Sequence, residues 1–355
     1  MDNIEVLENS EALKKIDNSG MLALAESMPE LLAEALALAK KVPPLKVKNI
    51  RQIVFSGMGG SAIAGDIARN LLLAGANVPS FVNRNFKAPA YVDKNTLFFA
   101  LSYSGNTDET LSALKDAERA QAEVVCVTSG GKLAEIAGSH NYPLYLIPSG
   151  YQPRAALPFI LVAILKCLEG VGFLPEIEKD IQRSVEIISR LKDEYGMEKP
   201  LRANPVKQLA RKIAGKIPVI FGSEGRTDAA ALRIKNQLNE NSKLTAFCNS
   251  FPELDHNEIV NLSALKRDEH SFVLVFLRDD GDLERIQKGI EITKSLIGRQ
   301  LGGVHEIFAQ GKSLLCRILS LIYFGDLLSV YLAVLSGTDP TPVDVITRLK
   351  KELGR

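Results

Sequence analysis

Residues 95–117 read NTLFFALSYSGNTDETLSALKDA, which is an apolar run, a turn rich in serine and glycine, and then apolar positions at helical spacing. The stretches IVFSGMGGSAIAGDIARNLL (53–72) and AEVVCVTSGGKLAEIAG (122–138) repeat the same order. Continuous apolar strands that alternate with helices are typical of a parallel sheet covered by helices on both faces. The sequence therefore predicts an α/β fold with a parallel sheet between two helical layers.

A second set of such stretches follows in the C-terminal half. KIPVIFGSEGRTDAAALRIKNQL (216–238) and HSFVLVFLRDDGDLERIQKGIEI (270–292) again join an apolar run, a turn and a helical segment. Between the two sets, KDEYGMEKPLRANP (192–205) concentrates charge, glycine and proline, as connections between domains do. We therefore expect two related parallel-sheet domains with weak internal symmetry.

Helical segments are expected at both ends of the chain. Apolar residues at helical spacing predict one helix over 20–41 and another over 342–353. The predicted organisation is an N-terminal helical segment (1–45), a first sheet domain (46–198), and a second sheet domain that includes the C-terminal helix (199–355).

The composition is that of a globular protein with a substantial core. Hydrophobic residues make up 46% and charged residues 24% of the 355 residues, which argues against a disordered or coiled-coil chain. The formal net charge of +1 is too small for the broad positive field that non-specific nucleic-acid or anionic-membrane binding uses. We expect neither partner, and any anion must be bound locally.

Three features favour a cytoplasmic protein. Cys126, Cys167, Cys248 and Cys316 form no C-x-x-C pair, which fits neither a zinc ribbon nor a disulfide framework. The N-terminus, MDNIEVLENSEALKKID, carries acids where a signal peptide needs a basic start and an apolar run. The long apolar stretch at 314–335 contains Arg317 and Asp326, so we expect a buried helix rather than a membrane span.

The turn after the first predicted strand, Gly57-Met58-Gly59-Gly60-Ser61-Ala62, matches the G-x-G-x-x-G/A dinucleotide fingerprint. A dinucleotide site needs an acid at the end of the next strand, but PSFVNRNF (79–86) offers Asn83 and Arg84 there. These residues would suit only the 2′-phosphate of NADP. An NADP-dependent oxidoreductase is therefore one alternative for this turn.

The second predicted strand ends in Ser102-Tyr103-Ser104-Gly105-Asn106-Thr107, which presents three serine and threonine hydroxyl groups at the start of a helix. Hydroxyls and the free backbone N–H groups of a helix N-terminus bind a phosphate monoester, because the helix dipole favours negative charge there. Two such loops at adjacent strand ends can meet at one phosphate. The alternative is that these residues are ordinary helix N-caps.

SYSGNTDET (102–110) resembles the phosphate loop of sugar isomerase (SIS) domains, and GMGGSAIAGD (57–66) resembles their first strand, turn and helix. The resemblance continues through the motifs GYQPRAALP (150–158), NQLNENSK (236–243), FPELDHNEI (251–259) and PTPVDVITRLKKEL (340–353). Together these motifs resemble the archaeal and bacterial bifunctional phosphoglucose/phosphomannose isomerases. The resemblance implies two flavodoxin-like SIS domains and the phosphate ligands Gly59, Gly60, Ser61, Ser102, Ser104 and Thr107.

Interconversion of an aldose and a ketose phosphate moves a proton between neighbouring carbons, and one partly desolvated carboxylate can take and return it. The resemblance identifies Glu240 as this base. The alternative is a solvated glutamate at a helix end. Arg154 matches the arginine of the family beside the reacting carbons, where its charge would stabilise an enediolate.

Because sugar phosphates exist mainly as rings, a proton must also reach the ring oxygen, and histidine suits this step near neutral pH. The resemblance assigns ring opening to His256, contributed across a homodimer interface, and to a lysine of the last helix. Lys350 fits this lysine best, although Lys351 is adjacent. The cluster Glu253, Asp255, His256 and Glu258 also permits a metal site, but an enediol route needs no metal.

The sequence thus predicts a cytoplasmic homodimeric isomerase that converts glucose 6-phosphate and mannose 6-phosphate to fructose 6-phosphate without a cofactor. Thr341 and Val343 are candidates for lining the sugar site, and Asp66 faces solvent or caps a helix. A rival from another class is a regulator that binds sugar phosphates through SIS domains. Such proteins commonly carry a DNA-binding helix-turn-helix, and this chain has no basic recognition segment.

Overall fold

The computed structural model describes residues 5–264, 271–298 and 301–353. The chain forms two compact units, here called the first unit (Met28–Val185) and the second unit (Met1–Ser27 with Glu186–Arg355). The division falls inside helix α8 (Ile177–Tyr195), ahead of the segment 192–205. Domain boundaries at residues 45 and 198 stay a prediction from the sequence.

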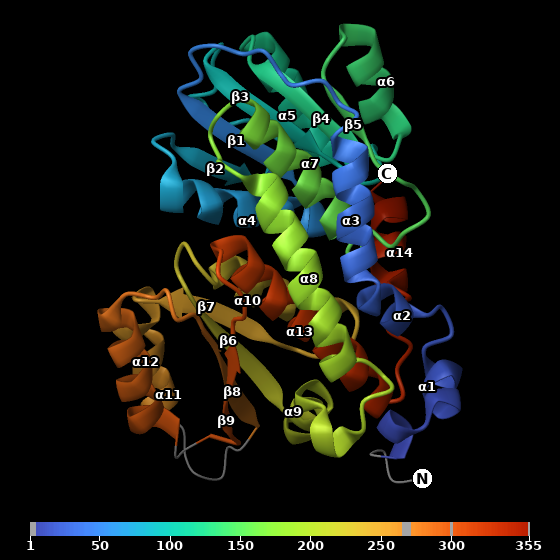
Figure 1. Ribbon diagram of the computed structural model, residues 1–355, viewed down its shortest axis with the longest axis vertical. Coiled ribbons are helices and arrows are strands. Elements are labelled where there is room, and N and C mark those ends of the chain that lie inside the picture. The colour runs from blue at the N-terminus through green and yellow to red at the C-terminus, as the bar shows by residue number, and fades with distance from the viewer. Residues whose placement is uncertain (1–4, 265–270, 299–300, 354–355) are drawn as a thin grey trace. The chain divides into compact units, whose positions relative to one another are not determined.

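The first unit contains a five-stranded parallel sheet with the order β2-β1-β3-β4-β5 (Figure 1). Its strands are β1 (Gln52–Gly57), β2 (Ser80–Asn83), β3 (Thr96–Leu101), β4 (Glu123–Thr128) and β5 (Leu144–Leu146). Its helices besides the start of α8 are α3 (Met28–Ala39), α4 (Gly59–Gly75), α5 (Asp108–Arg119), α6 (Gly131–His140) and α7 (Leu157–Gly170). The parallel α/β fold predicted from the sequence is confirmed.

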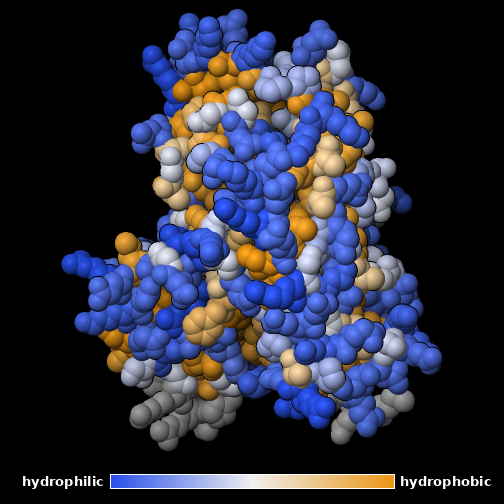
Figure 2. Space-filling model, viewed as in Figure 1, coloured by the Kyte–Doolittle hydropathy of each residue, from blue (hydrophilic) through white to orange (hydrophobic). Residues whose placement is uncertain are grey.

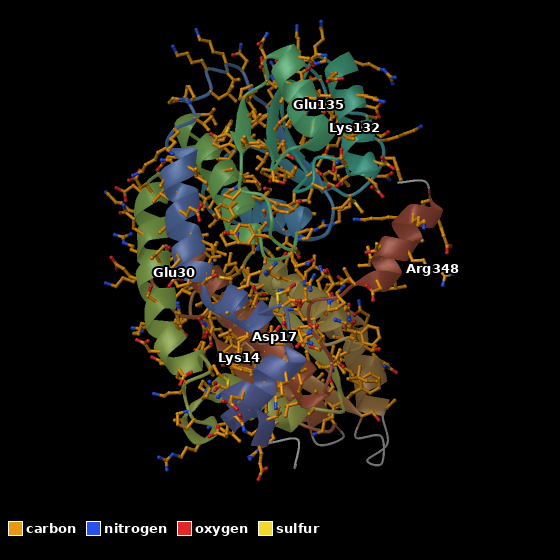
Figure 3. The ribbon with its side chains drawn as sticks, turned by 90° about the vertical axis from the view of Figure 1, so that its right-hand side faces the viewer. Lys14, Asp17, Glu30, Lys132, Glu135 and Arg348 are labelled. Carbon is orange, nitrogen blue, oxygen red and sulfur yellow. The ribbon has the colours of Figure 1, made fainter. Side chains whose placement is uncertain are left out.

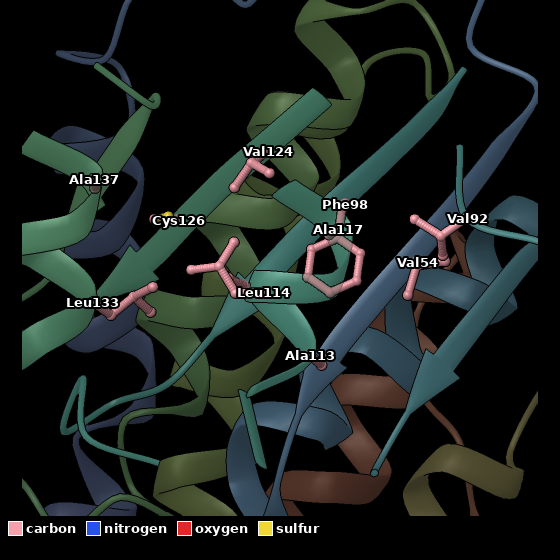
Figure 4. Close-up of a cluster of buried hydrophobic side chains, with 11 residues drawn as sticks. Val54, Val92, Phe98, Ala113, Leu114, Ala117, Val124, Cys126, Leu133 and Ala137 are labelled. Atoms are coloured by element: carbon pink, nitrogen blue, oxygen red, sulfur yellow. The ribbon is translucent and has the colours of Figure 1, made fainter. Parts of the chain in front are cut away.

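Helices cover both faces of this sheet. Side chains of β1, β3 and β4 that point to one face pack against α5 and α6, in a cluster that includes Val54, Phe98 and Leu114 (Figure 4). The opposite face carries Phe55 and Phe99, whose ring centroids lie 5.2 Å apart. Helix α4 packs there so closely that a Cβ at Gly65 would lie 2.7 Å from the Cβ of Phe55. Apolar residues on both faces explain why the strands read as continuous apolar runs.

The second unit contains a four-stranded parallel sheet with the order β7-β6-β8-β9. Its strands are β6 (Ile217–Ser223), β7 (Phe247–Phe251), β8 (Phe272–Arg278) and β9 (Val304–Phe308). Its larger helices are α9 (Pro205–Ile213), α10 (Asp228–Glu240), α12 (Glu284–Ile297), α13 (Leu314–Leu335) and α14 (Asp344–Glu352). Its shorter helices are η1 (Glu5–Glu8), α1 (Ser10–Ile16), α2 (Met21–Glu26), η2 (Leu201–Ala203), η3 (Glu253–His256) and α11 (Glu258–Ala264). The order repeats β2-β1-β3-β4, which confirms the internal symmetry expected from the sequence.

Helix α13 is the central helix of the second unit. It packs against α9 and α10, and Arg233 of α10 forms a buried ion pair with Asp326 of α13 at 2.6 Å. Its length and hydropathy are those of a membrane span, but its most apolar window is wholly buried. The expected buried helix is therefore confirmed, and Asp326 is tolerated inside it because Arg233 supplies the opposite charge.

The N-terminal residues up to Ser27 belong to the second unit. Asp17, labelled in Figure 3, accepts hydrogen bonds from the backbone N–H groups of Met21 and Leu22, both at 2.8 Å, and so caps α2. The buried Lys207 ammonium donates to the carbonyl of Leu7 at 2.7 Å. The single helix predicted over 20–41 is wrong: α2 and α3 are separate helices, divided at Ser27, because Pro29 favours a new helix start.

The surface shown in Figure 2 is largely hydrophilic, with apolar side chains interspersed. Exposed large apolar residues are found on strands and helices of both units, and α14 carries several of them, with Val345 the most exposed at 78%. Single exposed apolar residues are normal for a folded protein, but on α14 several lie on one helix.

Candidate active site

The ends of β1 and β3 bring two polar loops of the first unit together. These strands are adjacent and parallel, and Gly57 lies opposite Leu101 in their register. Met58 with the first turn of α4 (59–61) and the loop before α5 (102–107) therefore lie side by side at the carboxyl edge of the sheet, where open α/β sheets bind ligands.

The N-terminus of α4 lies against the backbone of Arg154. Gly59 has a φ of +50°, and a Cβ at Gly60 would lie 3.1 Å from the carbonyl oxygen of Pro153 and 3.2 Å from the Cα of Arg154. A larger residue at position 60 would push these two segments apart. Ser61 follows in the first turn of α4 and is 7% exposed.

The N-terminus of α5 carries a pair of hydroxyl groups. The Oγ of Ser102 and the Oγ1 of Thr107 lie 2.8 Å apart. Thr107 occupies the N-cap position of α5, but its side chain makes no capping hydrogen bond to the residues that the structure describes. The same holds for Met58, the N-cap residue of α4. Thr107 is therefore not a side-chain N-cap, so this alternative from the sequence is wrong for it. The exposed Ser104 lies in the same loop.

This arrangement has the chemistry of a phosphate site. Two helix N-termini without side-chain caps leave backbone N–H groups and positive dipole ends at the same edge of the sheet. The side chain of Arg154, which is 3% exposed, donates to Gln152 Oε1 at 3.4 Å. Arg154 thus carries a buried guanidinium on a segment whose backbone lies against Gly60, and such a positive charge suits an anionic ligand or intermediate.

The residues expected at a dinucleotide 2′-phosphate have partners inside the first unit. Arg84 forms an ion pair with Asp66 of α4, and Asn83 Nδ2 donates to Ser56 Oγ at 3.2 Å. Asp66 is 7% exposed, so the prediction that it faces solvent is wrong, while a capping role stays a prediction. A carboxylate paired with Arg84 is a poor neighbour for a second phosphate group, which weakens the NADP alternative.

Glu240 is the last residue of α10 in the second unit and is half-buried. The two following residues are fixed to α13: Asn241 Nδ2 donates to Ser329 Oγ at 2.8 Å, and Ser242 Oγ donates to the Ser329 carbonyl at 2.6 Å. These buried contacts hold the end of α10 in place. The carboxylate of Glu240 thus sits at a rigid helix end, as a proton-transferring group requires.

His256 is the last residue of η3 and is exposed. The acids around it have separate partners, because Asp255 Oδ1 accepts from Thr293 Oγ1 at 2.8 Å and Glu253 Oε1 accepts from Asn257 Nδ2 at 2.9 Å. Residues 5–264, 271–298 and 301–353 contain no group of three or more potential metal ligands. The metal alternative therefore has no support from this cluster.

Lys350 and Lys351 lie in the last turn of α14, and both are exposed. Arg348, labelled in Figure 3, lies on the same helix and pairs with Glu352 at 2.7 Å. The segment before α14 is fixed by Lys243, whose ammonium donates to the carbonyl of Asp339 at 2.8 Å. Thr341 and Val343 lie in this segment and are half-buried.

The sequence did not identify two residues that shape the phosphate loop. Asn106 Oδ1 accepts from the backbone N–H of Lys132 at 3.1 Å, which ties the loop to the start of α6. Tyr103 has a hydroxyl that accepts from the backbone N–H of Tyr151 at 2.8 Å. Both residues lie inside the motif SYSGNT (102–107). Their place between the serine and threonine residues of this motif was the only sign in the sequence that they shape the loop.

The predicted site residues thus form two sets. The structure brings together in the first unit Gly59, Gly60, Ser61, Ser102, Ser104, Thr107 and Arg154. The second unit carries Glu240, His256 and Lys350 on separate elements.

Comparison with known proteins gives matches to two family models and to several named proteins. A family model for the bacterial phospho-glucose isomerase C-terminal SIS domain matches residues 202–353, and the SIS domain model matches residues 46–150. The bifunctional phosphoglucose/phosphomannose isomerase of Caldicellulosiruptor bescii is 41% identical over 328 residues, which are 92% of this chain and 97% of that protein.

Two other similar proteins set limits on what likeness alone implies. A D-glucosamine-6-phosphate 4-epimerase of Sulfolobus acidocaldarius is 32% identical over 319 residues, 89% of this chain and 92% of that protein. The C-terminal domain of glucosamine-fructose-6-phosphate aminotransferase from Francisella tularensis superposes with a TM-score of 0.68 at 16% identity, over 90% of this chain and 97% of that chain. The second likeness shows a shared fold.

Proposed function

The chain belongs to the bifunctional phosphoglucose/phosphomannose isomerase family, and from this premise we propose that it converts glucose 6-phosphate and mannose 6-phosphate to fructose 6-phosphate. The observation that carries the proposal is the pair of uncapped helix N-termini, with their hydroxyl pair, at the adjacent ends of β1 and β3. Such an edge suits the phosphate of a hexose monophosphate.

In this proposal the first unit binds the charged end of the substrate. The hydroxyls of Ser61, Ser102, Ser104 and Thr107 and the backbone N–H groups of Gly59 and Gly60 hold the phosphate oxygens. The support is that the hydroxyl oxygens of Ser102 and Thr107 already lie 2.8 Å apart. Little further ordering of these side chains is therefore needed when the phosphate binds.

Glu240 then carries out the proton transfer. Its carboxylate removes the proton from C2 of the open-chain aldose, the C–H electron pair forms the C1–C2 double bond, and the carbonyl electrons pass to O1 to give a cis-enediolate. The O2 proton then passes to O1, and the C2 carbonyl forms as the protonated carboxyl group returns its proton to C1. Arg154 stabilises the negative oxygen that develops in between. Rotation of the enediolate about C2–C3 presents either face to the base, so both epimers reach the same ketose. The route needs neither metal nor cofactor.

Ring opening is assigned to His256, which gives a proton to the ring oxygen, with Lys350 assisting from α14. His256 serves the active site of a second copy of the chain in a homodimer. The exposure of His256 on η3 agrees with a role outside its own unit. The exposure of Lys350 agrees with a role at a substrate that enters from solvent.

The free cysteines, three of them buried, agree with a location in the cytoplasm.

A coupled assay of the purified protein tests the proposal. Glucose 6-phosphate and mannose 6-phosphate are supplied separately, with and without a chelator, and fructose 6-phosphate is measured. Turnover of both substrates in the presence of chelator is expected. Glucosamine 6-phosphate is included because one relative is named as its 4-epimerase, and epimerisation without isomerisation would overturn the proposal.

A further inference from the structure

The hydroxyl group of Tyr103 joins two loops of the first unit. Tyr103 lies between Ser102 and Ser104 after β3, and it is 7% exposed. Its hydroxyl oxygen accepts a hydrogen bond of 2.8 Å from the backbone N–H of Tyr151, a residue 48 positions later in the chain. The bond therefore connects the phosphate loop to the loop between β5 and α7.

Tyr103 is fixed at its own end of this connection. Its carbonyl oxygen accepts from the backbone N–H of Ser129 at 3.0 Å and from the Ser129 hydroxyl at 2.6 Å. The loop after β4 thus holds the main chain of Tyr103, and burial holds its ring. Its hydroxyl is a fixed acceptor at the carboxyl edge of the sheet.

The loop between β5 and α7 carries Arg154 and needs such a fixed point. Its start is held where the backbone N–H of Ile147 donates to the Thr128 carbonyl at 2.9 Å, and α7 begins at Leu157. Between these ends, Ser149 and Gly150 are exposed. The bond from Tyr103 reaches the middle of this span, three residues before Arg154.

We propose that Tyr103 is a positioning residue for Arg154, acting through its hydrogen bond to the Tyr151 backbone. The inference rests on the proposed function, in which Arg154 stabilises the enediolate. Such stabilisation depends on a guanidinium that is already in place, because a displaced charge must reorganise during the reaction. Tyr103 keeps Arg154 in place without touching the substrate. It also connects the segment of Arg154 to the loop that binds the phosphate.

Tyr103→Phe removes the hydroxyl and keeps the ring, so its kinetics test the proposal. We expect kcat with fructose 6-phosphate to fall by about 10-fold to 100-fold, as for a group misplaced by up to an ångström, with KM changed by less than about 3-fold. Tyr142→Phe is the matched control, since its hydroxyl contacts Glu118 at 3.5 Å away from this loop, and its kcat should stay near that of wild type. An unchanged kcat in Tyr103→Phe would overturn the proposal.

The double variant separates positioning from general stability. When Arg154→Ala is already present, Tyr103→Phe should cause little further loss of kcat, because the group that it positions is absent. If the two losses multiply instead, Tyr103 acts independently of Arg154 and the proposal is wrong.

Hydrogen exchange tests the contact without any assay of activity. Amides of residues 149–152 and 154–156 should exchange faster in Tyr103→Phe than in the wild type, whereas in Tyr142→Phe they should not. Unchanged exchange would overturn the positioning role even if catalysis is impaired. Conversely, a wild-type protein that turns over neither hexose 6-phosphate refutes the proposed function, while faster exchange in the variant still identifies the link between the loops.

Discussion

The same edge of the two sheets has opposite chemistry in the two units. In the first unit, the loops that follow β1 and β3 present hydroxyl groups and uncapped helix N-termini. In the second unit, the loop that follows β8, the strand corresponding to β3, presents two buried carboxylates, Asp279 and Asp282, and the loop after β6 carries Arg226. The two sheets share the order of these strands, so the difference lies in the loop sequences.

The carboxylates of the second unit are held by cations and a hydroxyl of the same unit. Asp279 forms ion pairs with Arg226 at 3.1 Å and with Arg317 at 2.8 Å. Asp282 accepts a hydrogen bond of 3.0 Å from the hydroxyl of Ser223, the last residue of β6. The second unit thus has its own carboxylates at this edge, whereas the first unit has hydroxyl groups there.

The comparison is consistent with different roles for the same sheet edge in the two units. A strand edge that is filled by internal ion pairs contributes stability, whereas one that ends in glycines and hydroxyls is able to bind an anion. In the second unit, the groups assigned to proton transfer therefore lie elsewhere, at the end of α10 and on η3 and α14. Four substitutions test this difference, from the largest expected effect to the smallest.

Glu240→Gln should separate chemistry from binding. The amide cannot accept the proton, so kcat should fall by about 10³-fold, within the range for loss of a general base. The dissociation constant for fructose 6-phosphate, measured by calorimetry, should change by less than about 3-fold. Glu284→Gln, at an exposed position of the same unit, is the control and should leave kcat unchanged. Retained turnover in Glu240→Gln would refute the assignment of the base.

Asp279→Asn should weaken the fold more than it weakens binding. Removing the buried carboxylate takes one counter-charge from Arg317 and leaves Arg226 with the more distant Asp282, at 3.5 Å, which costs about 3 kcal/mol of unfolding free energy. Urea denaturation measures the loss, and the exposed neighbour in Asp280→Asn should change it by less than about 0.5 kcal/mol. Equal stability of the two variants would contradict a structural role for the carboxylate of Asp279.

Thr107→Val should weaken binding more than it weakens the fold. Valine keeps the shape of threonine but loses the hydroxyl, so the affinity for fructose 6-phosphate should fall by about 10-fold, as expected for a hydrogen bond to a charged group. Thr110→Val lies in the same helix, with a hydroxyl that donates to the Leu101 carbonyl at 3.4 Å, and serves as the control. If both variants bind equally well, Thr107 is not a phosphate ligand.

Asp282→Asn should reveal a small dependence of stability on pH. Burial raises the pKa of Asp282 in the folded protein, with a smaller raising effect from the charge of Asp279. A raised folded pKa means that ionisation opposes folding, so this cost disappears as the pH falls through the folded pKa toward the unfolded value of about 4. The unfolding free energy of wild type minus that of Asp282→Asn should therefore increase from pH 7 to pH 4. A decrease would show that Arg226 and Ser223 outweigh burial.

Most of the fold could be predicted from the sequence because its signals are local. An apolar run, a glycine-containing turn and a helical period each fit within about 20 residues, as in residues 53–72. The two parallel sheets and the buried helix α13 follow from such signals. The break between α2 and α3 was missed because apolar spacing continues across Ser27.

The candidate site was predicted in part for the same reason. The loops that contain Ser102 and Thr107 are continuous motifs, whereas the partner of Asp66 is Arg84, which belongs to another element. Tyr103 was not identified because its partner, Tyr151, follows 48 positions later. Sequence spacing carries no information on contacts between loops that only the packed sheet brings together.

The sequence by itself thus determined the architecture, the family and the types of residue available at each strand end. Only the tertiary structure decided which partners meet across the chain: Arg317 reaches Asp279 from α13, whereas Ser102 and Thr107 meet locally, within one loop. Secondary structure depends on neighbours within one or two turns, so its pattern can be seen in the chain. Charge pairing depends on distance in space, and folding sets that distance between residues far apart in sequence.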